Sequence, residues 1–296
     1  MISHDEFMGI IYLNLTIFGA LGNTFLLYLY IFKFFTGSRT RYINLIIIHL
    51  AFVNFAIILF GGIPKTMQVW GLKSSLDDSG GKTISYFQRV FWDLSLCSPF
   101  LLSVFQAITI SPNSPRWADL KAKASKYIIP CFFSCWIFNL LVDIAVTVYI
   151  AGPKNDSKGT WNIGYSSIDL YDMNTIKIVI WKSVYEGVLM GLMAIASGYM
   201  MLVLYRHHQQ VRHIHSTSLT RRGSTETRAT KNILLLVSTY LCFNTVSFPF
   251  IIYLAPTKET MHWVIQVMVF FSLCYPAVCP MMLLINDTQI HTSCVL

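Results

Sequence analysis

The chain has 296 residues, of which 54% are hydrophobic and 12% are charged, and its formal net charge is +8. Average soluble domains carry roughly 25% charged residues, so too little polar surface remains here to coat a soluble globule. The sequence shows no basic groove interleaved with aromatic residues for nucleic acid. It also shows no phosphate loop, zinc-protease motif or nucleophile elbow. The composition therefore predicts a membrane protein that is not an enzyme and needs no cofactor.

Long apolar runs alternate with short polar loops along almost the whole chain. A mostly apolar run of about 18 residues or more is long enough to cross the hydrocarbon layer as a helix. We therefore expect an all-α membrane protein, a seven-transmembrane helix bundle that forms a single domain over residues 1–296. The expected spans are Phe7–Phe32, Leu45–Pro64, Tyr86–Ile110, Tyr127–Ile150, Ile176–Tyr205, Ile233–Ala255 and His262–Ile285.

The distribution of basic residues predicts how the bundle is oriented. The loops after the first, third and fifth spans are rich in Lys and Arg, whereas the opposite loops mix fewer lysines with Asp and Glu. Loops rich in Lys and Arg stay on the cytoplasmic side, so we expect the N-terminus outside and the C-terminus in the cytoplasm. On this topology Asn155, in an Asn-x-Ser sequon, is an outer-loop glycosylation site.

The cysteines and histidines predict neither a disulfide nor a metal site. No outer loop contains a cysteine, so an extracellular disulfide cannot form. Cys131 and Cys135 are four residues apart and suit one metal ion, but no histidine or second cysteine pair completes the site. We interpret them as small buried hydrophobes. The histidines between His207 and His215 lack the spacing of zinc ligands and indicate a solvated basic loop.

Ionisable residues lie in the outer halves of the third, fourth and fifth spans, beside aromatic residues. Such residues usually face the bundle interior or a water-filled cavity. One interpretation is a pair of ion pairs within single helices near the interface, Arg89 with Asp93 and Lys182 with Glu186, each four residues apart. The other is the polar floor of an outward-facing pocket with aromatic walls. The candidate ligand-binding residues are Arg89, Trp92, Asp93, Asp143, Trp181, Lys182, Tyr185 and Glu186.

Other polar and small residues predict contacts between helices. Asn23, His49 and Asn54 are expected to form hydrogen bonds between spans rather than to perform chemistry. Gly187 and Gly191 form a G-x-x-x-G pattern that permits close approach of helices. The pattern suits packing inside the bundle or formation of a homo- or hetero-dimer, and both interpretations stay open.

Several local strings identify a resemblance. The strings are HLAFVN at His49–Asn54, LLSVFQAITISP at Leu101–Pro112, RWADLKAK at Arg116–Lys123, LYRHHQQVRHIHS at Leu204–Ser216 and TRATKNILLLVST at Thr227–Thr239. Through them the chain resembles the vomeronasal type-1 receptors, the pheromone-type chemosensory branch of the G-protein-coupled receptors. Like that family, it lacks Asp-Arg-Tyr after the third span and Asn-Pro-x-x-Tyr in the seventh.

The resemblance implies a receptor in the plasma membrane of vomeronasal sensory neurons. It implies a pheromone-like small-molecule ligand and an inhibitory-class heterotrimeric G protein as partners, in addition to membrane lipid. Family members usually carry two cysteines where this chain has Gly81 and Ser166, so we expect no loop-to-helix disulfide. The basic residues expected to face the G protein are Arg116, Lys121, Lys123, Arg206, Arg212, Arg228 and Lys231.

Three alternatives to this function stay open. A bitter-taste-like receptor has a similar general layout. A small-molecule transporter would use the same outer charges, although transporters tend to show internal repeats and none is visible here. A diverged receptor that no longer signals is the third, favoured by the missing cysteines.

Overall fold

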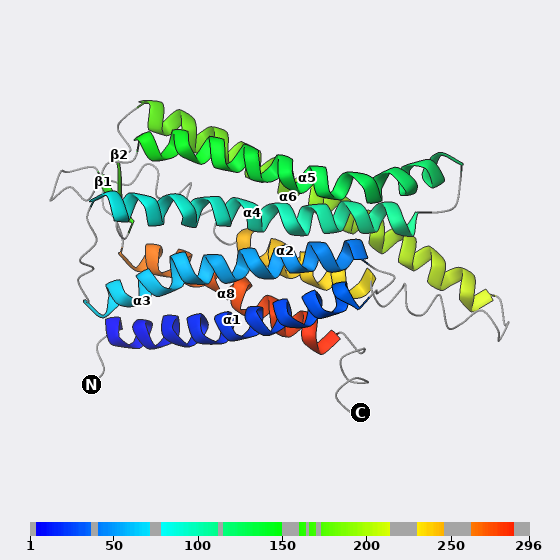
Figure 1. Cartoon of the computed structure of the whole chain (residues 1–296), viewed down its shortest axis with the longest axis horizontal. Helices are drawn as coiled ribbons and strands as arrows, with labels where there is room; N and C mark the ends of the chain where they lie inside the picture. Colours follow the sequence, from blue (N-terminus) through cyan, green and yellow to red (C-terminus); the bar gives the residue numbers. More distant parts are fainter. Residues whose placement is uncertain are drawn as a thin grey trace.

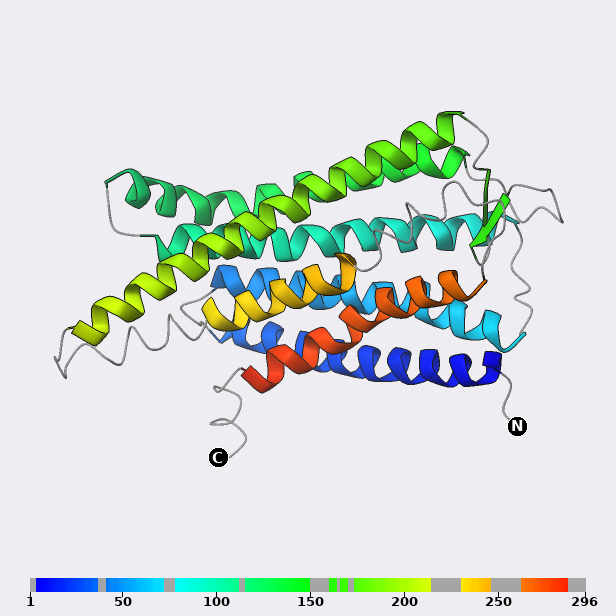
Figure 2. The same ribbon diagram turned by 180° about the vertical axis from the view of Figure 1, so that it is seen from behind.

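The computed structural model describes residues 4–36, 41–71, 78–111, 115–149, 160–163, 166–169, 173–213, 230–245 and 262–286. Long helices lie side by side in one elongated bundle (Figures 1 and 2), and the expected all-α class is confirmed. A further helix covers residues 230–245. The long labelled helices are α1 (His4–Phe35), α2 (Arg41–Ile57), α4 (Asp78–Ile110), α5 (Pro115–Tyr149), α6 (Met173–His213) and α8 (His262–Asn286).

Within the described residues, 6 segments are long and apolar enough to cross a membrane. They lie in α1, in α2 with its continuation, and in α4, α5, α6 and α8. The span expected at Ile233–Ala255 is described only up to residue 245, so its second half lies outside the described residues. The first turn of α1 and the last turn of α8 lie at opposite ends of the bundle (Figure 1).

Several helices are longer than their apolar runs. α4 begins at Asp78, ahead of the run that starts at Tyr86, and α5 begins at Pro115, ahead of Tyr127. α6 continues past Tyr205 to His213. Apolar length measures only the part of a helix that lies in hydrocarbon, whereas backbone hydrogen bonds can extend the helix into the headgroup region. Hydropathy therefore underestimates the lengths of these helices.

The second span is interrupted rather than continuous. A π-helical turn, η1 (Ile58–Gly62), follows α2, and a short helix, α3 (Ile63–Val69), continues past Pro64. Proline lacks an N–H and its ring clashes with the carbonyl of the preceding turn, which favours an interruption just before Pro64. Kinks of this kind occur at prolines and π-bulges.

A short antiparallel hairpin lies between α5 and α6. β1 (Thr160–Ile163) pairs with β2 (Ser166–Asp169), with Thr160 opposite Asp169 and Ile163 opposite Ser166. Sequence reasoning treated this segment as a loop, because its strands are too short to show an alternating pattern. The hairpin lies at the end of the bundle where α1 and α4 begin (Figure 1).

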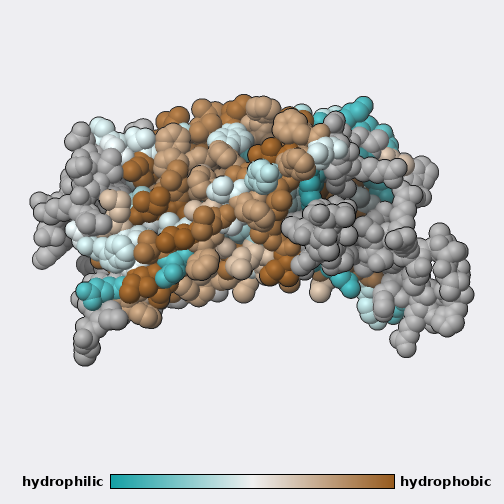
Figure 3. All heavy atoms as spheres, turned by 60° about the horizontal axis from the view of Figure 1, so that its bottom comes forward, coloured by the Kyte–Doolittle hydropathy of each residue, from teal (hydrophilic) through white to brown (hydrophobic). Residues whose placement is uncertain are grey.

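The bundle buries apolar side chains along its axis and exposes others outward. Leu26, Leu50, Leu102 and Leu236 come from four different helices and are almost completely buried in one hydrophobic cluster. On the outside, apolar side chains predominate over the middle of the face that carries α1, with hydrophilic side chains mainly toward the two ends (Figure 3). An apolar belt between polar ends is the surface that a bilayer requires.

α1 and α8 approach closely because glycines face α8. A methyl group at Gly22 would lie 2.8 Å from Cγ of Pro280, and one at Gly19 would lie 3.2 Å from the Cα of Ala277. We therefore expect Gly22→Ala to lower the free energy of unfolding by about 1–3 kcal/mol, the usual cost of overpacking.

Thermal unfolding of the purified receptor measures this effect, with Gly191→Ala as the matched control. A methyl group at Gly191 meets no atom within 4 Å, and alanine favours a helix, so the control should keep or slightly raise Tm. Equal Tm values for the two variants would contradict the close packing of α1 on α8.

Candidate functional site

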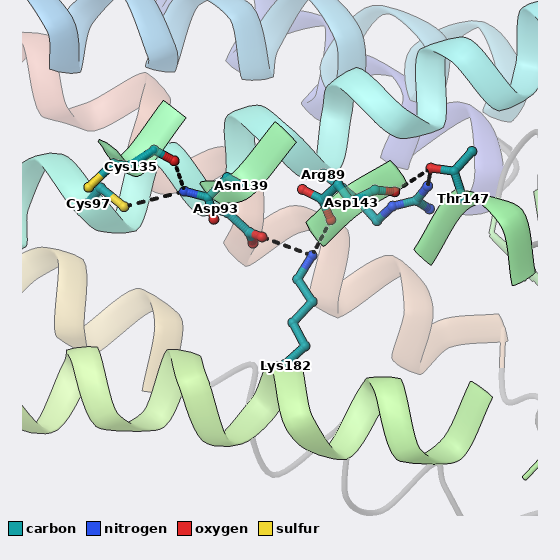
Figure 4. Close-up of polar contacts among 8 residues, drawn as sticks. All are labelled: Arg89, Asp93, Cys97, Cys135, Asn139, Asp143, Thr147 and Lys182. Atoms are coloured by element: carbon teal, nitrogen blue, oxygen red, sulfur yellow. Dashed lines mark hydrogen bonds and ion pairs between the residues drawn. The ribbon is translucent and has the colours of Figure 1, made fainter. Parts of the chain in front are cut away.

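A buried lysine joins three helices. Lys182 of α6 lies 3.1 Å from Oδ2 of Asp93 on α4 and 3.0 Å from Oδ1 of Asp143 on α5 (Figure 4). The side chains of Asp93 and Asp143 are 1% and 0% exposed, and that of Lys182 is 16% exposed. Charges in such surroundings are stable only when they are paired. We call Arg89, Asp93, Asp143, Lys182 and Glu186 the charge cluster.

The rest of the charge cluster corrects one sequence-based interpretation. Arg89 donates a hydrogen bond from Nη2 to Oγ1 of Thr147 on α5 at 2.8 Å, and Thr147 donates to the backbone oxygen of Asp143 at 2.7 Å. Among the described residues, Lys182 therefore pairs with α4 and α5 rather than with Glu186, and Arg89 bonds Thr147 rather than pairing with Asp93, which does not support the interpretation as ion pairs within single helices. Glu186 is half-buried on α6, one turn after Lys182.

Two polar stripes face each other and explain this geometry. Residues four apart share one face of a helix, and Arg89, Asp93 and Cys97 follow that spacing on α4. On α5 the stripe is Cys135, Asn139, Asp143 and Thr147, which runs in the opposite direction. Asn139 donates to the backbone oxygen of Cys135 at 2.8 Å and to Sγ of Cys97 at 3.7 Å (Figure 4). Antiparallel α4 and α5 thus match polar groups turn by turn.

Aromatic side chains extend the site across α5 and α6. The rings of Trp181 and Tyr185 stack, with centroids 6.1 Å apart and an interplanar angle of 8°. Phe138 of α5 contacts both rings, at 6.2 Å from Trp181 and 5.3 Å from Tyr185. Trp181 is 48% exposed, whereas Trp92 on α4 is half-buried. Phe138, Trp181 and Tyr185 therefore form one aromatic cluster, and Trp181 directly precedes Lys182 in the sequence.

The charge cluster lies in the half of the bundle where α1 begins. Lys182 follows the start of α6 at Met173, and Asp143 precedes the end of α5 at Tyr149, and both of these helix ends lie at that end of the bundle (Figure 1). The ion pairs of the cluster join α4, α5 and α6, so a change in these contacts would change how the three helices pack. A ligand shifts such an equilibrium only by binding one arrangement more tightly.

Two of the polar residues expected to tie helices together do so. Asn23 of α1 donates from Nδ2 to the backbone oxygen of Pro276 on α8 at 2.8 Å. His49 of α2 lies 2.7 Å from Oγ of Ser98 on α4 and accepts a hydrogen bond from Nε1 of Trp136 on α5 at 2.9 Å. Asn54 is buried and its side chain lies against the thiol of Cys279 on α8, although its amide atoms form no well-aligned hydrogen bond with the described residues.

At the opposite end of the bundle, hydrogen bonds join α4 to α6 and to the helix over residues 230–245. Oγ of Ser111 lies 2.8 Å from the hydroxyl of Tyr199, and Gln106 donates to Oγ1 of Thr230 at 2.8 Å. Lys121 donates to the backbone oxygen of Ser111 at 2.7 Å. These contacts join this end of α4 to α5, α6 and the helix over residues 230–245.

The basic residues expected at this end differ in their surroundings. Lys123 pairs with Asp119 at 2.8 Å on the exposed face of α5. Arg206 and Lys231 are exposed. The side chains of Arg116 and Arg212 lie outside the described residues, as do Arg228 and Asn155 altogether.

The described cysteines are free thiols. Cys131 and Cys135 are half-buried rather than buried as expected. Among the described residues no group of three or more His, Cys, Asp or Glu side chains is arranged to hold a metal ion. Gly81 lies in the first turn of α4 and Ser166 in β2.

Sequence reasoning missed Phe138, Asn139 and Thr147 on α5. The signal for the last two was present, because they lie four residues before and four residues after Asp143. No sequence signal placed Phe138 in the site, because an apolar residue in a membrane span can face either the lipid or the core of the bundle.

Comparisons with known proteins agree with this architecture. The model of the vomeronasal organ pheromone receptor family matches residues 7–295. Vomeronasal type-1 receptor 3 from Homo sapiens is 41% identical over 295 residues, covering 98% of this chain and 94% of that protein. Vomeronasal type-1 receptor 1 from Homo sapiens is 37% identical over 289 residues, covering 97% and 82%.

The fold also matches a solved structure. Squid rhodopsin superposes with a TM-score of 0.74 at 17% sequence identity, covering 96% of this chain and 82% of that chain. At this identity the match shows the fold alone, which is the seven-helix fold of the G-protein-coupled receptors. Together with the family match, it shows a multi-pass membrane receptor rather than an enzyme. The chain belongs to the vomeronasal organ pheromone receptor family.

Proposed function

We propose that this receptor binds a pheromone-like small molecule at the charge cluster and its aromatic neighbours and activates an inhibitory-class heterotrimeric G protein. The observation that carries the ligand site is the position of Lys182, whose ammonium group contacts carboxylates on two other helices. Pockets for small molecules combine apolar and aromatic walls with a few convergent polar groups. Trp181, Tyr185 and Phe138 supply such walls beside the charges.

The orientation that this function requires follows from charge. The loops at the end of the bundle opposite the charge cluster carry most of the Lys and Arg residues of the loops, and such loops remain in the cytoplasm. The N-terminus and the charge cluster are then on the outer side, and Asn155 is open to glycosylation. The receptor resides in the plasma membrane of vomeronasal sensory neurons, where an external ligand reaches it.

Activation is a shift between two helix arrangements. The hydrogen bonds of Ser111 with Tyr199 and of Gln106 with Thr230 hold the inner ends together in the resting arrangement. A ligand that prefers a different packing of α4, α5 and α6 weakens these contacts and opens the inner face. Arg206 and Lys231, exposed at this face, then contact acidic groups of the G protein.

A second receptor molecule is a further proposed partner, which would form a dimer through α6. A methyl group at Gly191 of the G-x-x-x-G pattern would meet no atom within 4 Å, and the same holds at Gly198, seven residues further along α6, so neither position packs against another helix of the bundle. Small residues let two membrane helices approach closely. A second copy of this receptor, or a related one, would pack there.

Nucleotide exchange on purified G proteins tests the coupling. The receptor is reconstituted in lipid with inhibitory-class or stimulatory-class α subunits, and urine fractions, gland fractions, volatile compounds and steroids are added. We expect exchange to rise on the inhibitory class alone, and Arg206→Gln with Lys231→Gln to reduce it several-fold. Lys177→Gln is the matched control, since Lys177 is exposed near the start of α6, at the other end of the bundle. Exchange on the stimulatory class alone would contradict the proposal.

A further inference from the structure

The charge cluster carries more negative than positive groups. Its carboxylates are Asp93, Asp143 and Glu186, and its cationic groups are Arg89 and Lys182. The ammonium group of Lys182 interacts electrostatically with all three carboxylates, whereas Arg89 interacts with the two aspartates. Glu186 therefore shares a lysine that already contacts Asp93 and Asp143, at 3.1 Å and 3.0 Å. One carboxylate in the cluster has no cation of its own.

The other described basic residues in this half of the bundle do not restore the balance. Lys65 of α3 donates to Oε1 of Gln68 at 3.0 Å. Lys82 lies near the start of α4, and Lys177 is exposed near the start of α6. Among the described residues, no salt bridge joins one of these lysines to Glu186. A charge between membrane helices is costly unless it is paired, so the cluster favours the arrival of a further cation.

The hydrogen-bonding capacity of the cluster is unbalanced in the same direction. Oδ1 of Asp93 and Oδ2 of Asp143 accept no hydrogen bond from the described residues, although the two side chains are 1% and 0% exposed. These carboxyl groups face the ammonium group of Lys182 between α4, α5 and α6 (Figure 4). Only one donor in the cluster is unpartnered in the same way, Nε of Arg89. An ionised carboxylate accepts only and an ammonium group donates only, so the excess acceptors also favour an ammonium group.

Tyr185 joins the aromatic cluster to these charges. Its hydroxyl lies against the thiol of Cys97 on α4, and it interacts electrostatically with Asp93. Its ring stacks on that of Trp181. The faces of aromatic rings attract cations, those of tryptophan most strongly, and proteins bind organic ammonium ions on such faces. The aromatic cluster therefore favours the same kind of group as the carboxylates.

We infer that the ligand group received at the charge cluster is an organic ammonium ion, a protonated amine whose counter-charge is Glu186. This inference rests on the proposed ligand site and adds the chemical class of the ligand. A metal ion fits less well, because no group of three or more His, Cys, Asp or Glu side chains in the described part of the chain is arranged to hold one. An anionic ligand would increase the excess negative charge. A proton on one carboxylate would cancel the excess and remove the preference for a cation.

Three probes of nearly equal size that differ in charge test the inference. Benzylamine is cationic at neutral pH, benzyl alcohol is neutral and benzoate is anionic. Each is added at the same millimolar concentration to the full-length receptor in nanodiscs of zwitterionic lipid. A ligand that binds only the folded receptor raises its stability. We expect benzylamine to raise Tm by about 2–4 °C and the other two probes to raise it by less than half as much.

Variants at Glu186 show whether this shift depends on the carboxylate. Glu186→Gln keeps the size of the side chain and removes its charge, so the benzylamine shift should disappear. Glu186→Asp keeps the charge and should retain most of the shift. Asp119→Asn, on the exposed face of α5, is the matched control and should retain all of it. Because each probe is compared between the native chain and its variants, effects of the probes on the lipid cancel.

The outcomes separate this inference from the proposed function. Equal shifts with the three probes, or a benzylamine shift that persists in Glu186→Gln, would overturn the ammonium class. A larger shift with benzoate or benzyl alcohol, lost in Glu186→Gln, would also overturn it but would leave a ligand site at the charge cluster. The proposed site itself fails if Glu186→Gln leaves the response to an activating fraction unchanged.

Discussion

Lys182→Met is expected to destabilise the receptor strongly. Lys182 is the shared partner of Asp93 and Asp143, at 3.1 Å and 3.0 Å, and both carboxylates are almost completely buried. Removing one partner of a buried ion pair typically costs about 3–5 kcal/mol, because the remaining charge is left unpaired. Here two carboxylates would be left. Thermal unfolding in detergent or nanodiscs measures the effect as a lower Tm.

A compensating variant separates charge pairing from packing. In Asp93→Asn with Asp143→Asn and Lys182→Met, the buried carboxylates are removed together with the lysine, and most of the lost stability should return. Lys123→Met is the matched control: its pair with Asp119 is exposed on both sides and contributes about 0–1 kcal/mol. A Lys182→Met variant as stable as the native chain would show that the ion pairs do not hold these helices together.

His49→Leu is expected to have a smaller but still large effect. Nε1 of Trp136 can only donate, so Nε2 of His49 accepts from it at 2.9 Å, and the ring proton on Nδ1 points to Oγ of Ser98 at 2.7 Å. One neutral tautomer thus links α2, α4 and α5. Leucine removes both hydrogen bonds and leaves the indole N–H without an acceptor, for a loss of about 2–4 kcal/mol.

A double-mutant cycle isolates this contribution. Trp136→Phe removes the donor, so the combination of His49→Leu with Trp136→Phe should cost less than the sum of the single changes, by about 1 kcal/mol or more. The free energies of unfolding of the four proteins, measured under the same conditions, give the coupling. Strictly additive losses would contradict a direct bond between His49 and Trp136.

The membrane fold was predictable because the thickness of the bilayer sets a minimum length for each apolar run that crosses it. The family followed from local strings such as HLAFVN at His49–Asn54. The interruption at Ile58–Gly62 was less accessible, since Pro64 predicts a kink but not the π-helical turn that precedes it. The hairpin of β1 and β2 was missed, because strands of 4 residues leave no periodic signal.

The charge cluster shows why sequence spacing was insufficient. The i,i+4 rule correctly put Arg89 with Asp93, and Lys182 with Glu186, on common helix faces. It could not reveal that Lys182 would meet Asp143, which lies 39 residues away. The partner of a charge depends on which helices are neighbours, and sequence spacing within one helix does not contain that information. Comparing the four-residue stripes of α4 and α5 would have brought Thr147 and Asn139 into the site.

The most direct test of the ligand site uses Glu186. It forms no salt bridge with the residues that the structure describes, so Glu186→Gln should fold and reach the cell surface, unlike a change at Lys182. Cells expressing the receptor with an inhibitory-class G protein and a calcium or cyclic-nucleotide reporter receive the fraction or compound that activates the native chain. At matched surface density, Glu186→Gln should raise the half-maximal concentration at least about tenfold, a change of about 1.4 kcal/mol in binding. The control Asp119→Asn, at an exposed position on α5, should not. Identical dose–response curves for the native chain and Glu186→Gln would contradict a ligand site at the charge cluster.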